Sequence, residues 1–362
     1  MERRVAQAHR GGRAVAPAHT LASLAGAAAL AALLVRCGDA SGPGPLPGTA
    51  AARTITESDM RARIAMLSDD SMGGRGTPSP GLEMAASAIS QVFEQLGLIP
   101  AFDRSFIQRY PTSTDTPPVP VPERSPAAET APNVAAMLEG SDPERLREFV
   151  VVVAHMDHLG TAGQPGSLCV AELADSICNG ADDNASGTAA VLELAEAFVA
   201  LPRHPARSII FLAVSGEEHG FWGSLWFLDH SPVPTGQIVA VVNLDMIGRN
   251  ARDSVLVGGL DMSTLGDAAL AAAAAHPEEG MRPVTGPIGG SDQLPFYRRG
   301  IPFLMFHSGL HADYHRPSDT VNRIDAEKAA RIVRLAFYTA LATANAVTRP
   351  GWHYLASLGA RP

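Results

Sequence analysis

The stretch SIIFLAVSGEEHGFWGS, residues 208–224, decides the fold class of this chain. Its first seven residues are almost all apolar, and two adjacent carboxylates, Glu217 and Glu218, follow shortly after them. An unbroken apolar strand is buried on both faces, as in a parallel or mixed sheet that helices cover. Carboxylates are rarely buried without a partner, so this pair is either solvated or lies beside a strong positive charge.

Two further apolar stretches, FVVVVAH at 149–155 and IVAVVNLD at 238–245, are also predicted strands. Apolar positions at helical spacing predict helices within residues 54–70, 81–101, 185–201, 223–231 and 326–347. Because strands and helices alternate from residue 134 onward, we expect an α/β fold of three layers. Its central sheet is mostly parallel or mixed, with helices on both faces.

The composition excludes one class of partner. The 362 residues are 46% hydrophobic, enough for a large core, and carry a formal net charge of -9. Outside the first few residues there is no basic run, so the electrostatic signature of a nucleic-acid-binding protein is missing. We therefore expect no nucleic-acid partner.

The first part of the chain has the pattern of an export signal. Residues 1–36 begin with basic residues and end in an apolar run, Leu21 to Val35, of signal-peptide length. Residues 37–53 are small and rich in Pro and Gly, as in a linker. Cys37 has the position of a lipoprotein anchor, although Arg36 is not the small residue expected before it. Cleavage with lipidation, cleavage without it and an uncleaved anchor all stay open. The expected location is extracytoplasmic: secreted, periplasmic or tethered to a membrane through Cys37.

Two cysteines lie in the predicted folded part. Cys169 and Cys178 are nine residues apart, and in an oxidising compartment they can close a small loop. The alternative is two free thiols. Zinc ligation by the pair is the weaker hypothesis, because no second cysteine pair is present.

Residues that can bind a metal follow the predicted strands. The candidates are His155, Asp157, His158, Asp182, Asp183, Glu217, Glu218, Asp245, His311, Asp313, His315 and Asp319. Singly, each has an ordinary explanation: His155 as a core histidine, Asp183 as a helix N-cap, the glutamates as solvated residues. Together they are expected at the carboxyl edge of one sheet, where open α/β folds place their sites.

This set of side chains suits zinc, since imidazole and carboxylate are both zinc ligands. There are more carboxylates than one tetrahedral zinc uses, so two Zn2+ ions that share a bridging carboxylate are the simplest arrangement. Co2+ or Mn2+ are substitutes that the ligand types do not exclude.

Five motifs resemble those of the dizinc aminopeptidase family, which includes secreted bacterial leucyl aminopeptidases and, more distantly, glutamate carboxypeptidase and glutaminyl cyclase. In chain order they are AHMDHLG (154–160), NGADDNASG (179–187), SGEEHGFWGS (215–224), NLDMIGR (243–249) and DYHRPSDT (313–320). The likeness covers about residues 134–340, and more weakly 57–100. It implies a zinc-peptidase fold of the phosphorylase/hydrolase-like type and hydrolysis of N-terminal residues from peptides.

The resemblance assigns metal-binding roles to five residues. Asp183 would bridge both zinc ions, since it is the aspartate that is followed by one residue and then by ASG. His155 and Asp245 would complete one metal site. Glu218 and His315 would complete the other.

Two more residues would carry the chemistry. Glu217 would be the general base that takes a proton from the attacking water. Asp157 would accept a hydrogen bond from His155 and fix its tautomer. The family also places a cis peptide bond after the bridging aspartate, so the Asp183–Asn184 bond is expected to be cis. The resemblance thus implies that Glu218 would bind metal and that Glu217 would move a proton.

A single catalytic domain is expected over residues 54–350, with the Pro-rich stretch 111–133 as a surface loop. That loop is too short for an inserted domain, so an open cleft that takes small peptides is expected. Four apolar residues flank the motifs: Phe221, Trp222, Phe306 and Leu310. Each either lines an apolar substrate pocket or packs in the core. The sequence does not determine the oligomeric state.

Two other functions are left open. A mono-zinc enzyme of the glutaminyl cyclase type would use a similar scaffold to cyclise N-terminal glutamine. A non-catalytic binding ectodomain would be expected to have lost metal ligands, and none is lost here.

Overall fold

The computed structural model describes residues 48–112 and 129–353. The predicted export signal, Cys37, most of the predicted linker and the middle of the Pro-rich loop lie outside the described residues. No helix in the described ranges is both long enough and apolar enough to cross a bilayer.

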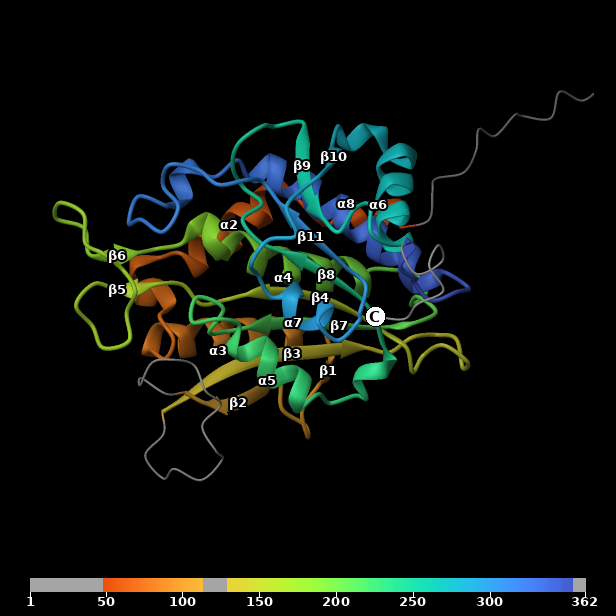
Figure 1. Ribbon diagram of the computed structural model, residues 1–362, viewed down its shortest axis with the longest axis horizontal. Helices are drawn as coiled ribbons and strands as arrows, with labels where there is room; N and C mark the ends of the chain where they lie inside the picture. Colours follow the sequence, from red (N-terminus) through yellow and green to blue (C-terminus); the bar gives the residue numbers. More distant parts are fainter. Residues whose placement is uncertain (1–47, 113–128, 354–362) are drawn as a thin grey trace, which may run out of the picture. The chain divides into compact units, whose positions relative to one another are not determined.

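The centre of the fold is a mixed sheet with nine described strands (Figure 1). Eight of them follow the order β1-β3-β7-β4-β8-β11-β9-β10, and β2 pairs with β3. Their bounds are β1 Ile99–Pro100, β2 Ile107–Pro111, β3 Thr130–Leu138, β4 Phe149–His155, β7 Ser208–Val214, β8 Ile238–Leu244, β9 Ser254–Gly258, β10 Arg282–Thr285 and β11 Phe303–His307. The two short strands β5 (Gly160–Thr161) and β6 (Ile177–Cys178) form a separate ribbon.

The four central strands β7, β4, β8 and β11 run parallel, and this part of the sheet positions the site. In the register, His155 at the end of β4 lies opposite Val214 at the end of β7. All three strands predicted from the sequence are therefore neighbours with their carboxyl ends at one edge. The outer strands β3 and β9 pair antiparallel with this parallel centre, which makes the sheet mixed as expected.

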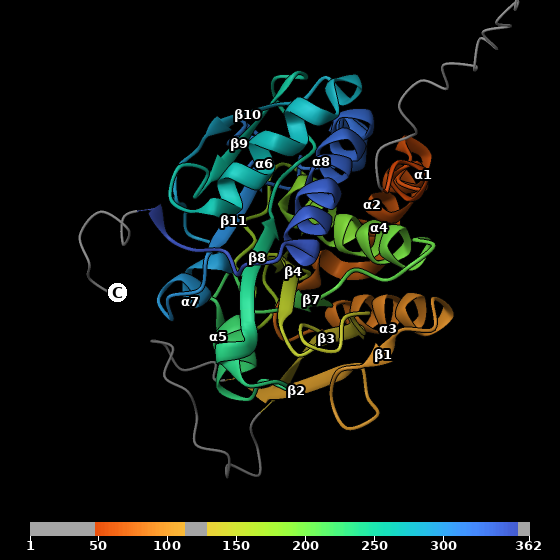
Figure 2. The same ribbon diagram turned by 90° about the vertical axis from the view of Figure 1, so that its right-hand side faces the viewer.

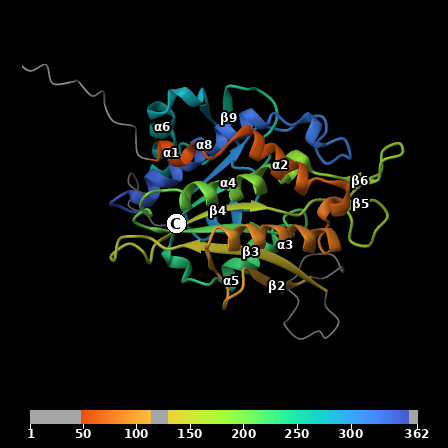
Figure 3. The same ribbon diagram turned by 180° about the vertical axis from the view of Figure 1, so that it is seen from behind.

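Helices cover both faces of the sheet (Figures 2 and 3). They are α1 Thr49–Ala52, α2 Glu57–Leu67, α3 Pro80–Gln95, α4 Gly187–Val199, α5 Trp222–Asp229, α6 Thr264–Ala275, α7 Gln293–Tyr297 and α8 Ala326–Asn345. Successive side chains of β4 point to opposite faces, so Val150 and Val152 join one apolar core while Val151 and Val153 join another. The first core includes α2, α3, α4, α6 and α8, and the second includes α5 and α7. The three-layer prediction is confirmed.

Side-chain caps fix where several helices begin. Thr56 accepts a hydrogen bond from the Asp59 amide at the start of α2, and Ser79 caps α3, whose first residue is Pro80. Asp325 caps α8 in the same way. These residues satisfy amides that have no partner inside the helix, which is why each helix starts there.

The predicted boundaries need three corrections. Residues 49–52, assigned to the linker, form α1, and Ala51 and Ala52 are buried in the core, because alanine is both a strong helix former and small enough to pack closely. Residues 130–133, assigned to the Pro-rich loop, belong to β3, and residue 111 ends β2. At the other end, Trp352 lies beyond residue 350 but donates a hydrogen bond to the Gly300 carbonyl, so the folded part continues past that limit.

Cys169 and Cys178 form a disulfide. The bond closes the loop between β5 and β6. This ribbon begins shortly after His158 and ends directly before Asn179. The structure thus has the disulfide and not two free thiols.

Candidate metal centre

Five segments meet at the carboxyl edge of the parallel strands. His155 is the last residue of β4, Glu218 follows β7 and Asp245 follows β8 directly. Asp183 lies in the kinked segment Ala181–Ser186 before α4, and His315 lies in the loop after β11. The sheet thus brings together the five residues that the family resemblance assigns to metal binding.

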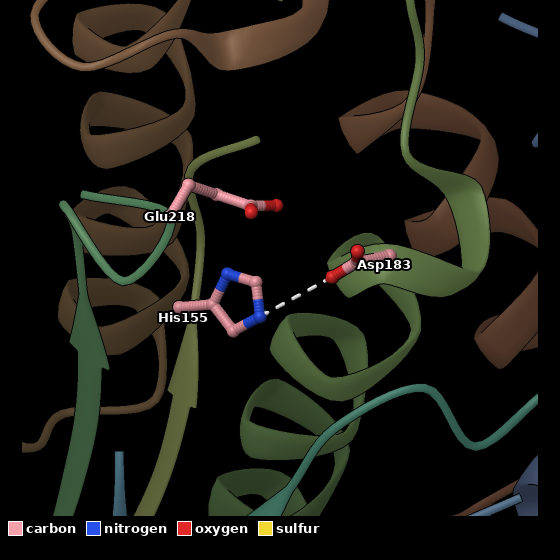
Figure 4. A group of neighbouring side chains, drawn as sticks. All are labelled: His155, Asp183 and Glu218. Atoms are coloured by element: carbon pink, nitrogen blue, oxygen red, sulfur yellow. Dashed lines mark ion pairs between the residues drawn. The ribbon is translucent and has the colours of Figure 1, made fainter. Parts of the chain in front are cut away.

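Asp183 is at the centre of this group. Its Oδ1 lies 3.4 Å from His155 Nε2, and its Oδ2 lies 3.2 Å from His315 Nε2. The His315 nitrogen is also 3.2 Å from Glu218 Oε2. Figure 4 shows His155, Asp183 and Glu218 pointing toward one another from three segments, and one ligand atom from each lies within 4.8 Å of the others. This spacing suits side chains that hold a common cation.

Asp245 adds a fourth carboxylate oxygen, and its Oδ1 lies 3.6 Å from His155 Nε2. That oxygen is buried and accepts no hydrogen bond from any residue in the described ranges. Asp245 is 6% exposed, so water reaches the side chain poorly. A buried carboxylate oxygen without a hydrogen-bond donor is costly unless a cation lies nearby, so the donor set fits a metal.

The charges of the cluster favour a cation as well. Burial lowers the pKa of His315, but hydrogen bonds to Asp183 and Glu218 outweigh it and raise the pKa to about 10. Burial also lowers the pKa of His155, and neighbouring carboxylates again hold the pKa well above its ordinary value. These carboxylates are Glu217, Asp157, Asp183 and Asp245. A zinc ion would relieve the same excess of negative charge that here favours protonated imidazole.

Glu217 differs from Glu218 in its surroundings. Burial raises the pKa of the Glu217 carboxyl well above its ordinary value; His155 opposes this effect, while Asp292, Glu218 and Asp245 add to it. A carboxylate with a raised pKa takes up a proton more readily near neutral pH. The surroundings of Glu217 thus favour its protonated form, whereas Glu218 is hydrogen-bonded to a histidine of the cluster.

Asp157 is buried in the site, but its contact with His155 differs from the expected one. The closest acceptor to His155 Nδ1 is the backbone carbonyl of Asp157 at 3.2 Å, while its carboxylate Oδ1 lies 3.7 Å away. The hydrogen bond from His155 to this carboxylate therefore stays a prediction. A main-chain acceptor two residues ahead already occupies that side of the ring, and the carboxylate instead accepts from the Glu217 amide at 3.3 Å.

His158 belongs to the cluster although no role was assigned to it. Its Nδ1 lies 2.8 Å from Glu218 Oε1 and 3.8 Å from Asp183 Oδ2, and it is 1% exposed. Its Nε2 has no hydrogen-bond partner in the part of the chain that the structure describes. The sequence signal was present, since His158 stands in the same motif as His155.

The other candidates of the last motif lie behind the cluster. Asp319 Oδ2 accepts hydrogen bonds from the amides of Asp182 and Asp183 at 3.0 and 3.1 Å. Asp313 pairs with Arg249 at 2.6 Å, and His311 Nε2 lies 3.3 Å from Asp182 Oδ2. None of these three residues joins the central group. Asp319 and His311 contact the segment that carries Asp183, whereas Asp313 pairs with Arg249 after β8.

The segment that carries Asp183 has the expected backbone. The Asp183–Asn184 peptide bond is cis, as the family resemblance implied. The Asn184 side chain donates to the Leu244 carbonyl at 3.0 Å and accepts from the Gly187 and Met246 amides. Asn184 therefore ties the bridging candidate to the end of β8.

The four apolar residues near the motifs have different environments. Phe306 is fully buried and belongs to the core, whereas Leu310 is 66% exposed. Phe221 and Trp222 are partly exposed beside the Glu217 turn, and the ring of Trp222 stacks on His219 at 4.7 Å. Of the four, Phe221, Trp222 and Leu310 are exposed enough to contact a substrate.

The comparison with protein families decides the assignment. The model of Peptidase family M28 matches residues 133–340, more than half of the chain. This chain belongs to Peptidase family M28. The five motifs and all the residues of the central cluster lie inside the matched range.

Individual relatives agree with the family. The chain is 30% identical over 176 residues to aminopeptidase YwaD of Bacillus subtilis (strain 168), which covers 45% of this chain and 38% of YwaD. The chain thus spans less than half the length of the first curated relatives that it matches.

Two crystal structures share the fold. The LapA aminopeptidase of Legionella pneumophila superimposes with a TM-score of 0.62 at 19% identity, over 83% of this chain and 74% of LapA. Glutaminyl cyclase of Porphyromonas gingivalis does so with a TM-score of 0.59 at 15% identity, over 78% of this chain and 97% of that one. At these identities the likeness shows the fold, and the fold alone does not choose between peptide hydrolysis and cyclisation.

Proposed function

We propose that this M28 member is a dizinc aminopeptidase that removes N-terminal residues from small peptides. The observation that carries the proposal is the central position of Asp183 between His155 and His315, with Glu217 next to the ligand candidate Glu218. The assigned ligands are Asp183 as the shared carboxylate, His155 and Asp245 for one ion, and Glu218 and His315 for the other.

The proposed chemistry depends on Glu217. Bound zinc would supply Lewis acidity, which lowers the pKa of a water and polarises the scissile carbonyl. Glu217 takes the proton of the attacking water and then gives it to the leaving amine. The raised pKa of the Glu217 carboxyl supports this role, because the group must hold a proton between the two transfers.

The charge of the site supports a substrate with a free amino terminus. The cluster has more carboxylates than imidazoles, and an α-ammonium group is a small cation that carboxylates bind well. Two of the similar proteins, YwaD and LapA, are named as aminopeptidases, which favours the same substrate class.

The extracytoplasmic location is part of the same proposal. The Cys169–Cys178 disulfide supports it, since structural disulfides persist mainly in oxidising compartments. Fractionation of the producing cells, with the oxidation state of the two cysteines measured in each fraction, tests the location. Recovery of reduced protein in the cytosol alone would contradict it.

The test of the function is hydrolysis of a panel of aminoacyl-p-nitroanilides by the full chain, with zinc measured on the same sample. Hydrolysis with about two zinc ions per chain is expected from the shared-carboxylate arrangement. Ammonia release from N-terminal glutamine peptides, with one zinc and no hydrolysis, would establish the cyclase instead. Absence of zinc and of turnover would leave a binding ectodomain.

A further inference from the structure

Part of the site is built by a loop that precedes the family-matched residues. Residues 73–77, GGRGT, lie outside the matched range 133–340. Two side chains of this loop are nonetheless buried against the metal centre: Arg75 is 0% exposed and Thr77 is 2% exposed.

The hydroxyl of Thr77 joins the ends of two strands. It donates to Asp157 Oδ2 at 3.0 Å and accepts from the Gly216 amide at 3.2 Å. A threonine hydroxyl has one donor and two acceptor positions, so it makes both bonds at once. Asp157 follows β4 and Gly216 follows β7, so a single oxygen holds the two segments in register at the site.

Both of these bonds fix the position of Glu217. Gly216 is the residue directly before it, and the Glu217 amide donates to the second oxygen of Asp157 at 3.3 Å. Gly216 has a φ of +70°, and a Cβ there would lie 2.7 Å from the Tyr110 hydroxyl. The turn that presents Glu217 is therefore fixed by close packing on one side and by the Thr77–Asp157 pair on the other.

Arg75 holds the loop itself in place. Its guanidinium donates to the carbonyls of Met156, Asn179 and Gly180 at 2.8, 2.8 and 3.0 Å, and also to that of Leu67. Met156 stands directly after His155, and Gly180 stands three residues before Asp183. Burial lowers the pKa of Arg75 to about 10, so the group stays protonated at neutral pH and all these donors are present.

We propose that Thr77 is a positioning residue for Glu217: its hydroxyl, by bonding Asp157 and Gly216 together, aims the Glu217 carboxylate at the attacking water. The inference rests on the proposed function for the role of Glu217. A displaced catalytic group can cost on the order of 100-fold in rate without weakening substrate binding.

Thr77→Val tests the proposal, because it keeps the shape of the side chain and removes only the hydroxyl. We expect kcat to fall roughly 10-fold to 100-fold, with KM and zinc content close to wild type. Thr77→Ser keeps the hydroxyl and is expected to restore most of kcat. The matched control is Thr339→Val, which removes another fully buried threonine hydroxyl, one that bonds Leu335 within α8.

Two readouts separate positioning from a general loss of stability. If Thr77 acts through Glu217, adding Thr77→Val to Glu217→Gln lowers the residual rate little further. In the zinc-free protein, amide hydrogen exchange at Gly216 is expected to be faster in Thr77→Val, and unchanged in Thr77→Ser and in Thr339→Val. Melting temperatures of all variants confirm that each is folded at the assay temperature.

The proposal is overturned if Thr77→Val keeps the wild-type kcat, or if it lowers the rate equally with and without Glu217. It is also overturned if Gly216 exchange does not change. If the wild type cleaves no aminoacyl substrate, the proposed function fails separately, and the exchange at Gly216 still decides whether the Thr77 hydroxyl holds this turn.

Discussion

His158 Nδ1 lies 2.8 Å from Glu218 Oε1, so the second histidine of the AHMDH motif faces the glutamate and not the solvent. His155, three residues earlier, instead faces Asp183 and Asp245. The motif thus divides its two imidazoles between the two proposed zinc sites. His158 holds the proposed ligand Glu218 in place without being assigned to a zinc itself.

This relationship predicts that His158→Phe weakens zinc binding at the site of Glu218. Loss of a hydrogen bond to a metal ligand typically lowers metal affinity about 10-fold to 100-fold. His158→Gln can keep a hydrogen bond to Glu218 and is expected to lose less. Competition with a fluorescent zinc chelator measures both affinities; equal zinc affinity in His158→Phe and wild type would refute the assigned contact.

Glu217→Gln is expected to abolish most turnover while zinc stays bound. The amide cannot take a proton, and removal of a general base typically costs about 100-fold to 10,000-fold in rate. The measurement is kcat on the best anilide together with zinc content by mass spectrometry. Glu94→Gln, an exposed substitution of the same kind on α3, is the control and should behave as wild type. A Glu217→Gln variant that loses zinc would assign this residue to the ligands instead.

Asp183 and Asp182 make a matched pair for the bridging role. Asp183 lies among three imidazoles, whereas Asp182 Oδ1 accepts from the Gly248 amide at 2.6 Å. We expect Asp183→Asn to lose zinc from both sites. Asp182→Asn should keep zinc and mainly lower the melting temperature. Its amide oxygen can still accept from Gly248, but an amide nitrogen replaces the oxygen that lies 3.3 Å from His311 Nε2. Loss of a buried polar partner costs roughly 1–3 kcal/mol. If Asp182→Asn loses more zinc than Asp183→Asn, the bridging assignment is wrong.

The apolar strands were the most predictable part of the fold. FVVVVAH and SIIFLAV have few polar residues to break the pattern, and both appear as β4 and β7 with the expected first residues. β3 was missed because Pro132 and Asn133 interrupt its apolar pattern; the structure accommodates Asn133 by burying its side chain against the Gly223 carbonyl. A tertiary hydrogen bond of this kind overrides the local preference.

The site was predictable where it depends on strand ends and not where it depends on distant partners. His155, Glu218 and Asp245 follow parallel strands, so the topology alone brings them to one edge. Thr77 gave no such signal, because its partner Asp157 is 80 residues away in the sequence. No periodic pattern indicates that its hydroxyl is buried at the site. The main-chain acceptor of the His155 ring was not predicted for a similar reason: residue spacing cannot distinguish a side-chain oxygen from a main-chain oxygen of Asp157.

The pH dependence of the zinc-free protein gives the last prediction. Burial raises the pKa of Glu217 well above its ordinary value and that of Asp292 to about 7. The folded state therefore keeps protons on these carboxyls that the unfolded state releases above about pH 4. His315, with its pKa raised to about 10, also binds its proton more tightly when folded. All three contributions are complete at low pH and are lost as the pH rises through the folded pKa values.

We therefore expect the melting temperature of the EDTA-treated protein to fall between pH 5 and pH 8, and zinc to reduce this fall by replacing the protons as the counter-charge. Asp183, whose pKa is lowered mainly by His158 and His155 against the effect of burial, acts below this window and does not reverse the slope. Differential scanning calorimetry with EDTA and with zinc measures both curves, and Asp292→Asn should flatten the EDTA curve. A zinc-free protein that melts at a higher temperature at pH 8 than at pH 5 would show that these carboxyls are not protonated in the folded state. The argument that the site carries an excess of negative charge, which a metal ion would neutralise, would then fail.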